Sequence, residues 1–224
     1  MRGGSLLLAC VVLGALCVLP TLAQESYRLE ALQTTPIGLA ESIAKALQPA
    51  GARLLSGERK TIAELWLRKE IPLKATAIEV GYGALAEGTL VGALNFPEGG
   101  SDFRGQTIAP GVYTLRFERI PQDGNHLGAA PESNFLLLCP AAADHDLDAA
   151  FGFESLVELS RKASGTNHPA PLMLMTVSEE GEFPGIETND VGHVALRMKT
   201  SSKALTWDDA KDFPLALVLV GRAE

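Results

Sequence analysis

The chain has 224 residues, with 27 acidic and 19 basic side chains and a formal net charge of −8. A chain of this size buries roughly 70% of the surface that it exposes when unfolded, which is enough to build a hydrophobic core. The acidic balance supplies no basic patch that would release counterions from a phosphate backbone, so we expect no nucleic-acid partner.

The first 23 residues have the pattern of a secretory signal peptide. One basic residue, Arg2, precedes an apolar run from Leu6 to Leu19, and a break with small residues follows up to Ala23. The run of about 14 residues is short for a bilayer, which needs about 20, so we expect cleavage after Ala23 and no stable membrane anchor afterwards. The mature chain would carry 18 basic and 27 acidic residues, a net charge of −9, in the periplasm or outside the cell.

A polar lead-in, residues 24–34, is predicted to precede a single β-rich domain, residues 35–224. Thr35 and Pro36 are residue types favoured at the N-cap and the first position of a helix, and apolar residues then recur at helical spacing up to Leu47. The sequence therefore predicts a first helix at the start of the domain.

From Gly51 onward the apolar period changes from 3.6 residues to 2, which is typical of antiparallel strands. Eight segments with this pattern are predicted to be strands: Thr61–Ile71, Leu73–Gly81, Thr89–Phe96, Val112–Ile120, Asn134–Cys139, Pro171–Val177, Gly192–Lys199 and Pro214–Gly221. Residues 135–139 and 215–220 are apolar on both faces, which predicts central strands. The fold is expected to be mainly β, an antiparallel β-sandwich-like domain with about two accessory helices.

Three other segments add detail to this prediction. In residues 112–119 apolar side chains alternate with polar ones, which predicts a strand with one solvent-exposed face. An apolar stripe at helical spacing within residues 144–164 predicts the second helix. A short helical turn is also expected at residues 207–211.

A cluster of potential metal ligands precedes the predicted second helix. Asp144, His145, Asp146 and Asp148 bring three carboxylates and an imidazole together, and these groups bind Ca²⁺ or transition metals. The spacing does not match the calcium loop of EF-hands, and carboxylates before a helix also cap its free N–H groups. These four residues are thus weak metal candidates, with helix capping as the alternative, and we expect no cofactor.

Two polar strand faces are candidate binding surfaces. Alternation in the strand around Trp66 places Glu64, Trp66 and Arg68 on one face, an arrangement that can hold a sugar or a peptide segment. The alternative is that a helix or a loop covers Trp66, because large aromatic side chains are usually buried. His193 and Arg197 also share one strand face, which is either a second binding surface or a solvated one.

The sequence contains no recognisable nucleophile motif. Cys139, the only cysteine after the predicted signal, lies in an apolar run, where burial raises the pKa of a thiol, and it is predicted to be a core residue. There is no Gly-x-Ser-x-Gly elbow. A glycoside hydrolase needs two facing carboxylates, and spacing alone selects no pair among 27 acidic residues.

Residues 105–115, Gly-Gln-Thr-Ile-Ala-Pro-Gly-Val-Tyr-Thr-Leu, resemble the turn-and-strand signature Leu-x-Ala-Gly-x-Tyr-x-Leu. This signature belongs to a family of exported bacterial β-sandwich proteins of unknown function. The likeness extends over residues 52–140, and it implies an exported sandwich with no established activity.

We therefore expect an exported, non-catalytic binding or accessory module whose partner is a small molecule, a glycan or a protein. The alternatives are a secreted hydrolase with an acidic active site and a structural subunit of a cell-envelope assembly. The polar loops at residues 97–105 and 121–133 are long, and long loops carry function more often than core strands do.

Overall fold

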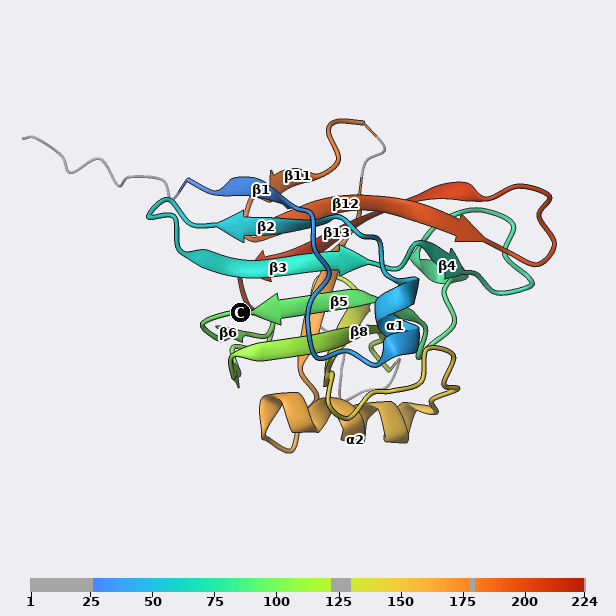
Figure 1. Ribbon diagram of the computed structural model, residues 1–224, viewed down its shortest axis with the longest axis horizontal. Coiled ribbons are helices and arrows are strands. Elements are labelled where there is room, and N and C mark those ends of the chain that lie inside the picture. Colours follow the sequence, from blue (N-terminus) through green and yellow to red (C-terminus); the bar gives the residue numbers. More distant parts are fainter. Residues whose placement is uncertain (1–25, 122–129, 178–179, 224) are drawn as a thin grey trace, which may run out of the picture.

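The computed structural model describes residues 26–121, 130–177 and 180–223. The predicted signal, residues 1–23, lies outside these ranges. Within them the fold is mainly β with two α-helices, as predicted (Figure 1).

One large antiparallel sheet makes up most of the structure. Its strands follow the order β1-β2-β3-β5-β8-β9-β10-β13-β12-β11, and β4 is attached beside β12. The bounds are β1 Arg28–Leu32, β2 Gly51–Leu55, β3 Thr61–Leu67, β4 Glu70–Pro72, β5 Leu90–Phe96, β8 Gly111–Arg119, β9 Asn134–Pro140, β10 Pro171–Met175, β11 Gly185–Thr188, β12 Val194–Lys203 and β13 Lys211–Val220. Two short strands, β6 Gly100–Ser101 and β7 Thr107–Ile108, pair separately.

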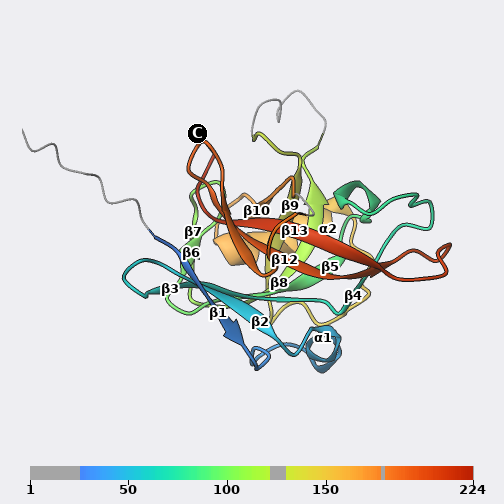
Figure 2. The same cartoon turned by 90° about the horizontal axis from the view of Figure 1, so that it is seen from above.

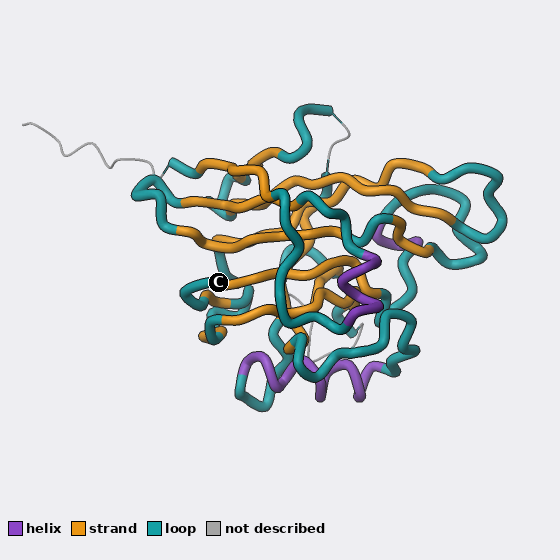
Figure 3. Tube along the Cα trace, viewed as in Figure 1, coloured by secondary structure: helices purple, strands orange, loops and turns teal. Residues whose placement is uncertain are grey.

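The sheet curls back on itself and encloses the main core. β4 comes two residues after β3 and pairs in parallel with β12, which lies near the far end of the strand order. Two halves of one continuous, curled sheet therefore provide the two layers of the sandwich-like arrangement, as the view from above (Figure 2) and the Cα trace in the orientation of Figure 1 (Figure 3) illustrate. Fully buried side chains from both halves meet inside, among them Leu65, Phe117, Leu138 and Phe213.

The doubly apolar segments are central, as predicted. β9 and β13 flank β10 in the middle of the strand order. Every residue from Phe135 to Cys139 is buried, with the even-numbered side chains in the main core and the odd-numbered ones on the opposite face. Burial raises the pKa of the Cys139 thiol, so this cysteine is a core residue, as expected.

The two α-helices cover the outside of the sheet. In Figure 1, α1 (Glu41–Ala46) lies at the ends of β5 and β8, and α2 (Phe153–Ser164) runs below β8. α2 packs against β9. α1 is shorter than predicted and begins after Ala40 rather than at Thr35. Gly38 explains this difference, because its positive φ of 97° interrupts any helix that starts at Pro36.

Three predicted elements are wrong. Residues 73–81 form turns rather than a strand, and residues 207–211 contain no helix. The lead-in, residues 24–34, contains β1, which pairs with the edge of β2 from Arg28 to Leu32. Backbone pairing to an open edge needs no apolar alternation, so the polarity of this segment did not reveal the strand.

The polar face of β8 is buried, so the prediction that this face is exposed to solvent is wrong. Thr114 and Arg116 are fully buried and Glu118 is 5% exposed. The segment that precedes α2 covers Thr114 and Arg116, and its Asp144 forms a buried charge pair with Arg116. The alternating polar residues of β8 therefore belong to a second buried layer, on the side of the sheet opposite the main core.

Candidate functional site

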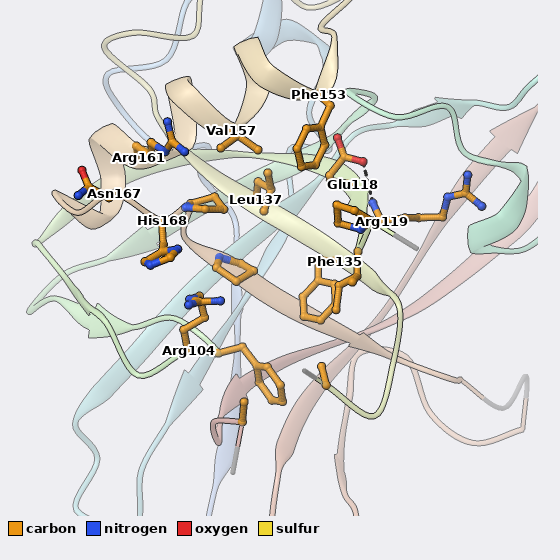
Figure 4. A pocket seen from close by; sticks show the side chains of 17 residues that line it. Arg104, Glu118, Arg119, Phe135, Leu137, Phe153, Val157, Arg161, Asn167 and His168 are labelled. Carbon is orange, nitrogen blue, oxygen red and sulfur yellow. Dashed lines mark hydrogen bonds between the residues drawn. The ribbon is translucent and has the colours of Figure 1, made fainter. Parts of the chain in front are cut away.

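A cavity of about 500 Å³ lies between α2 and the outer face of β8, β9 and β10. This volume is within the range of small-molecule sites, about 300–1,000 Å³. Figure 4 shows side chains from α2, from the strands and from three loops that converge on it. The lining residues are Phe103, Arg104, Glu118, Arg119, Ile120, Pro121, Ala130, Phe135, Leu137, Phe153, Val157, Arg161, Asn167, His168, Pro169, Pro171 and Ala223.

The packing of α2 on β9 explains why the cavity exists. Leu156 and Leu159 pack on the outward side chains of Leu137 and Cys139. The buried hydroxyl of Ser160 donates a hydrogen bond to the carbonyl oxygen of Leu138 at 2.8 Å. These contacts fix the helix on the sheet and leave Val157, Phe153 and Arg161 beside the open space (Figure 4).

The floor and the walls of the cavity are apolar and aromatic. Phe135 and Leu137 point outward from β9, and Val157 faces them from α2 (Figure 4). The rings of Phe103 and Phe135 have centroids 6.1 Å apart and are tilted by 54°. Phe153 at the edge is 43% exposed, an unusual state for a phenylalanine. A ligand in the cavity would cover this ring.

One end of the cavity is cationic and polar. Arg104, Arg161, Asn167 and His168 gather on the same side in Figure 4, and all four are exposed. Within the described residues, neither of the two guanidinium groups has a hydrogen bond or an ion pair, and the charge of Arg104 acts at longer range on the buried carboxylate of Asp102. Both groups are therefore available to a ligand.

A hydrogen-bond network holds the backbone at this cationic end. The buried carboxylate of Asp102 accepts hydrogen bonds from the backbone N–H groups of Arg104, at 3.0 Å, and of Gln106, at 2.8 Å. The Gln106 amide donates to the carbonyl oxygen of Pro169 at 2.8 Å. The Thr166 hydroxyl accepts a hydrogen bond from the backbone N–H of His168 at 3.0 Å. Two loops far apart in the sequence are thereby held side by side.

Glu118 lies at the other end of the cavity, beside Phe153 (Figure 4). It accepts a hydrogen bond from the backbone N–H of Arg119 at 2.8 Å. Burial raises the pKa of the Glu118 carboxyl, and the nearby charge of Glu87 raises it further. The backbone hydrogen bond from Arg119 and the charge of its side chain, which is paired with Glu87 at 3.0 Å, offset part of this increase.

Replacing Glu118 by glutamine is expected to stabilise the protein at about pH 8. The raised pKa means that the folded state binds the Glu118 proton more tightly than the unfolded state does. The wild-type protein therefore loses stability as pH rises from the unfolded pKa through the folded pKa, and the full penalty remains above that window. Glutamine can still accept the Arg119 hydrogen bond but carries no charge.

The measurement is the melting temperature of both proteins at about pH 4 and at about pH 8. The advantage of Glu118→Gln should be present at the higher pH and absent at the lower one. An advantage of equal size at both pH values would show that the carboxylate charge is not its cause.

The structure contradicts the prediction that Trp66 is exposed on a binding face. This side chain is 3% exposed and packs with Leu32, Leu47 and Ala93. Its indole N–H donates a hydrogen bond to the carbonyl oxygen of Thr34 at 2.7 Å. The segment around Thr34 and α1 covers the ring, which agrees with the alternative that a helix or a loop hides it.

The neighbours of Trp66 do not form a shared binding face either. Glu64 is 9% exposed and accepts hydrogen bonds from Arg53, at 2.6 and 2.8 Å, and from Asn95, at 2.8 Å. Arg68 points to Asp148, with 3.3 Å between the nearest atoms. Glu64 thus belongs to a polar ladder across β2, β3 and β5, and Arg68 to a contact with the loop before α2.

Arg197 lies on β12 and His193 directly precedes this strand, but the two side chains do not form one open surface. His193 is buried, with the centroid of its ring 5.2 Å from the centroid of Phe103 in an edge-to-face arrangement and its Nε2 atom 3.1 Å from the carbonyl oxygen of Arg222. The His193 ring therefore packs against Phe103, which lines the cavity. Arg197 stacks over Phe183 at 4.6 Å and donates a hydrogen bond to the carbonyl oxygen of Glu180 at 2.6 Å.

The predicted metal candidates are separated by their contacts. Asp144 is buried in the pair with Arg116, whereas Asp148 is exposed and contacts Arg68. Asp146 accepts a hydrogen bond from the backbone N–H of Asp148, and the carbonyl oxygen of His145 accepts one from Ser42. In the described ranges no three His, Cys, Asp or Glu side chains come together as metal ligands. None of these carboxylates caps α2, whose N-cap is Gly152.

Sequence reasoning missed most of the cavity. Phe103 and Arg104 do come from the loop predicted to carry function, and Pro121 and Ala130 come from the second such loop. Residues 122–129 of that second loop lie outside the described residues. The contributions of α2 and of residues 167–169 carry no local signal, because only packing of the helix on β9 brings them to the loops.

Comparison with known protein families, curated proteins and solved structures gave no match for this chain. Among the described residues, no helix has the length and apolar character needed to span a bilayer.

Proposed function

We propose that this protein is an exported, non-catalytic binding protein that holds a small, mainly apolar molecule in the cavity between α2 and β8, β9 and β10. The observation that carries the proposal is the cavity itself, with about 500 Å³ of space above an aromatic floor. Natural ligand sites combine such apolar linings with a few polar groups, and the cationic end supplies those groups here.

The composition of the lining favours binding over hydrolysis. A hydrolase with an acidic site needs two carboxylates that face each other across the substrate. The cavity lining includes one carboxylate, Glu118, whose raised pKa follows from its burial. The remaining lining groups offer contact area, hydrogen bonds and positive charge, which are means of recognition.

Binding of a neutral, environment-sensitive dye tests this proposal. N-phenyl-1-naphthylamine, whose emission rises in apolar surroundings, is expected to bind one equivalent with a dissociation constant on the order of 10 μM. The Val157→Trp variant places an indole in the cavity and should weaken binding at least about tenfold, because the space for the dye is occupied. Val157→Phe should have an intermediate effect.

The matched control is Glu158→Trp, which puts the same side chain on the next residue of α2, away from the cavity. It should bind the dye as the wild-type protein does. Melting temperatures establish that each variant is folded. Saturable binding that Val157→Trp leaves unchanged, or no binding by the wild-type protein, would contradict the proposal.

A further inference from the structure

We infer that the ligand of this cavity is an amphipathic anion, with its charged group between Arg104 and Arg161 and its apolar body over Phe135 and Leu137. This inference rests on the proposed function, because it names the chemical class of the molecule that the cavity holds. It is carried by the uneven distribution of charge along the lining.

The cationic end stands out against the rest of the protein. The whole chain has a formal net charge of −8, yet Arg104, Arg161 and His168 gather at one end of the cavity (Figure 4). Most other arginines pair with carboxylates: Arg53 with Glu64, Arg116 with Asp144 and Arg119 with Glu87. Arg104 and Arg161 form no such ion pair among the described residues, and the charge of Arg104 acts only at longer range on the buried Asp102. An anionic group of a ligand would form ion pairs with both guanidinium groups.

The geometry suits a carboxylate or another planar or tetrahedral oxyanion. A guanidinium presents several N–H donors in one plane and binds oxyanions through paired, charge-assisted hydrogen bonds. Arg104 follows the buried Asp102 turn, and Arg161 lies in the last turn of α2, so both start from rigid backbone. Anchoring at the backbone reduces the entropy that the site loses when it orders around a ligand.

The opposite end sets the orientation and the number of charges. Glu118 lies there with Phe153 and accepts the backbone hydrogen bond from Arg119, whose side chain is paired with Glu87. A second anionic group at this end would be repelled by the carboxylate or would require its protonation. The cavity is therefore suited to a ligand with one anionic end and an apolar remainder.

Three ligands with the same ten-carbon chain test the inference: decanoate, 1-decanol and decylammonium. Each is titrated against the complex of the protein with N-phenyl-1-naphthylamine at low ionic strength. Decanoate is expected to displace the dye at about tenfold lower concentration than 1-decanol, and decylammonium at a higher one. The advantage of decanoate should shrink as salt is added, because exposed charge pairs are screened.

The Arg104→Gln/Arg161→Gln variant tests the contribution of the two positive charges separately from that of the apolar lining. It should bind the neutral dye and 1-decanol as before, and it should lose the roughly tenfold preference for decanoate. The matched control, Arg28→Gln/Lys162→Gln, removes the same two charges from exposed positions outside the lining and should keep the preference.

The possible outcomes distinguish this inference from the proposed function. If the neutral dye does not bind, the proposed function fails and the inference fails with it. If the dye binds but decanoate and 1-decanol compete equally, only the assignment of an anionic ligand is overturned. That assignment is also overturned if both double variants lose the preference to the same extent, since the overall net charge would then be its cause.

Discussion

Replacing Asp144 by alanine is expected to lower the free energy of unfolding by about 3–5 kcal/mol. The carboxylate is 1% exposed and binds the fully buried guanidinium of Arg116 through two contacts, at 2.6 and 2.7 Å. Removal of the carboxylate leaves a positive charge buried without its counterion, which costs far more than the loss of an exposed ion pair. This pair also holds the segment before α2 on the sheet.

Urea denaturation measures this effect, with Asp148→Ala as the matched control. Asp148 is 76% exposed and its contact with Arg68 is 3.3 Å long, so its loss should cost less than about 1 kcal/mol. The double variant Arg116→Met/Asp144→Leu should recover much of the stability, because it leaves no buried charge unpaired. Equal costs for Asp144→Ala and Asp148→Ala would show that the buried pair has no special weight.

Replacing Trp66 by alanine is expected to cost about 3–5 kcal/mol of stability, as for other buried large aromatics. The ring fills the space between β3 and the segment that carries Thr34 and α1. Its loss leaves a cavity and an unpaired carbonyl oxygen, and the covering segment should detach more readily. Limited proteolysis at Lys45, in α1, would then proceed faster than in the wild-type protein.

The Trp66→Phe variant provides the comparison for this prediction. It keeps most of the apolar contact and removes the hydrogen bond to Thr34, so about 1–2 kcal/mol should be lost. Replacing a surface tryptophan that served only to bind a ligand would leave the stability of the protein almost unchanged. Denaturation curves of Trp66→Ala that coincide with those of the wild-type protein would support that role and contradict the burial described here.

Local patterns were sufficient for most of the sheet. A strand such as β9 or β13 is apolar on both faces only if both faces are covered, and this condition can be read from five or six residues. The segment at residues 73–81 shows the limit of this reasoning. Its apolar residues fit a strand pattern, but the chain turns there, with the Lys74 N–H bonded to the carbonyl oxygen of Ala84.

The candidate site depended on contacts that no local pattern contains. Arg116 and Glu118 alternate with core residues as solvent-exposed side chains do, and their burial results from α2 and from Asp144, which is 28 residues after Arg116. Trp66 is covered by Thr34, which lies 32 residues before it. The polarity of the two long loops did indicate part of the cavity, because loop residues are free to line a site that strands and a helix support.

The most direct test of the central claim is to observe which residues respond when a ligand is added. Decanoate is titrated into the isotope-labelled protein, and the NMR signals of backbone amides and methyl groups are followed. The binding site described here predicts saturable shifts of the Val157 and Leu137 methyl groups and of the Arg104 amide, while signals of the Trp66 region stay in place. Shifts confined to other surfaces, or none at all, would contradict it.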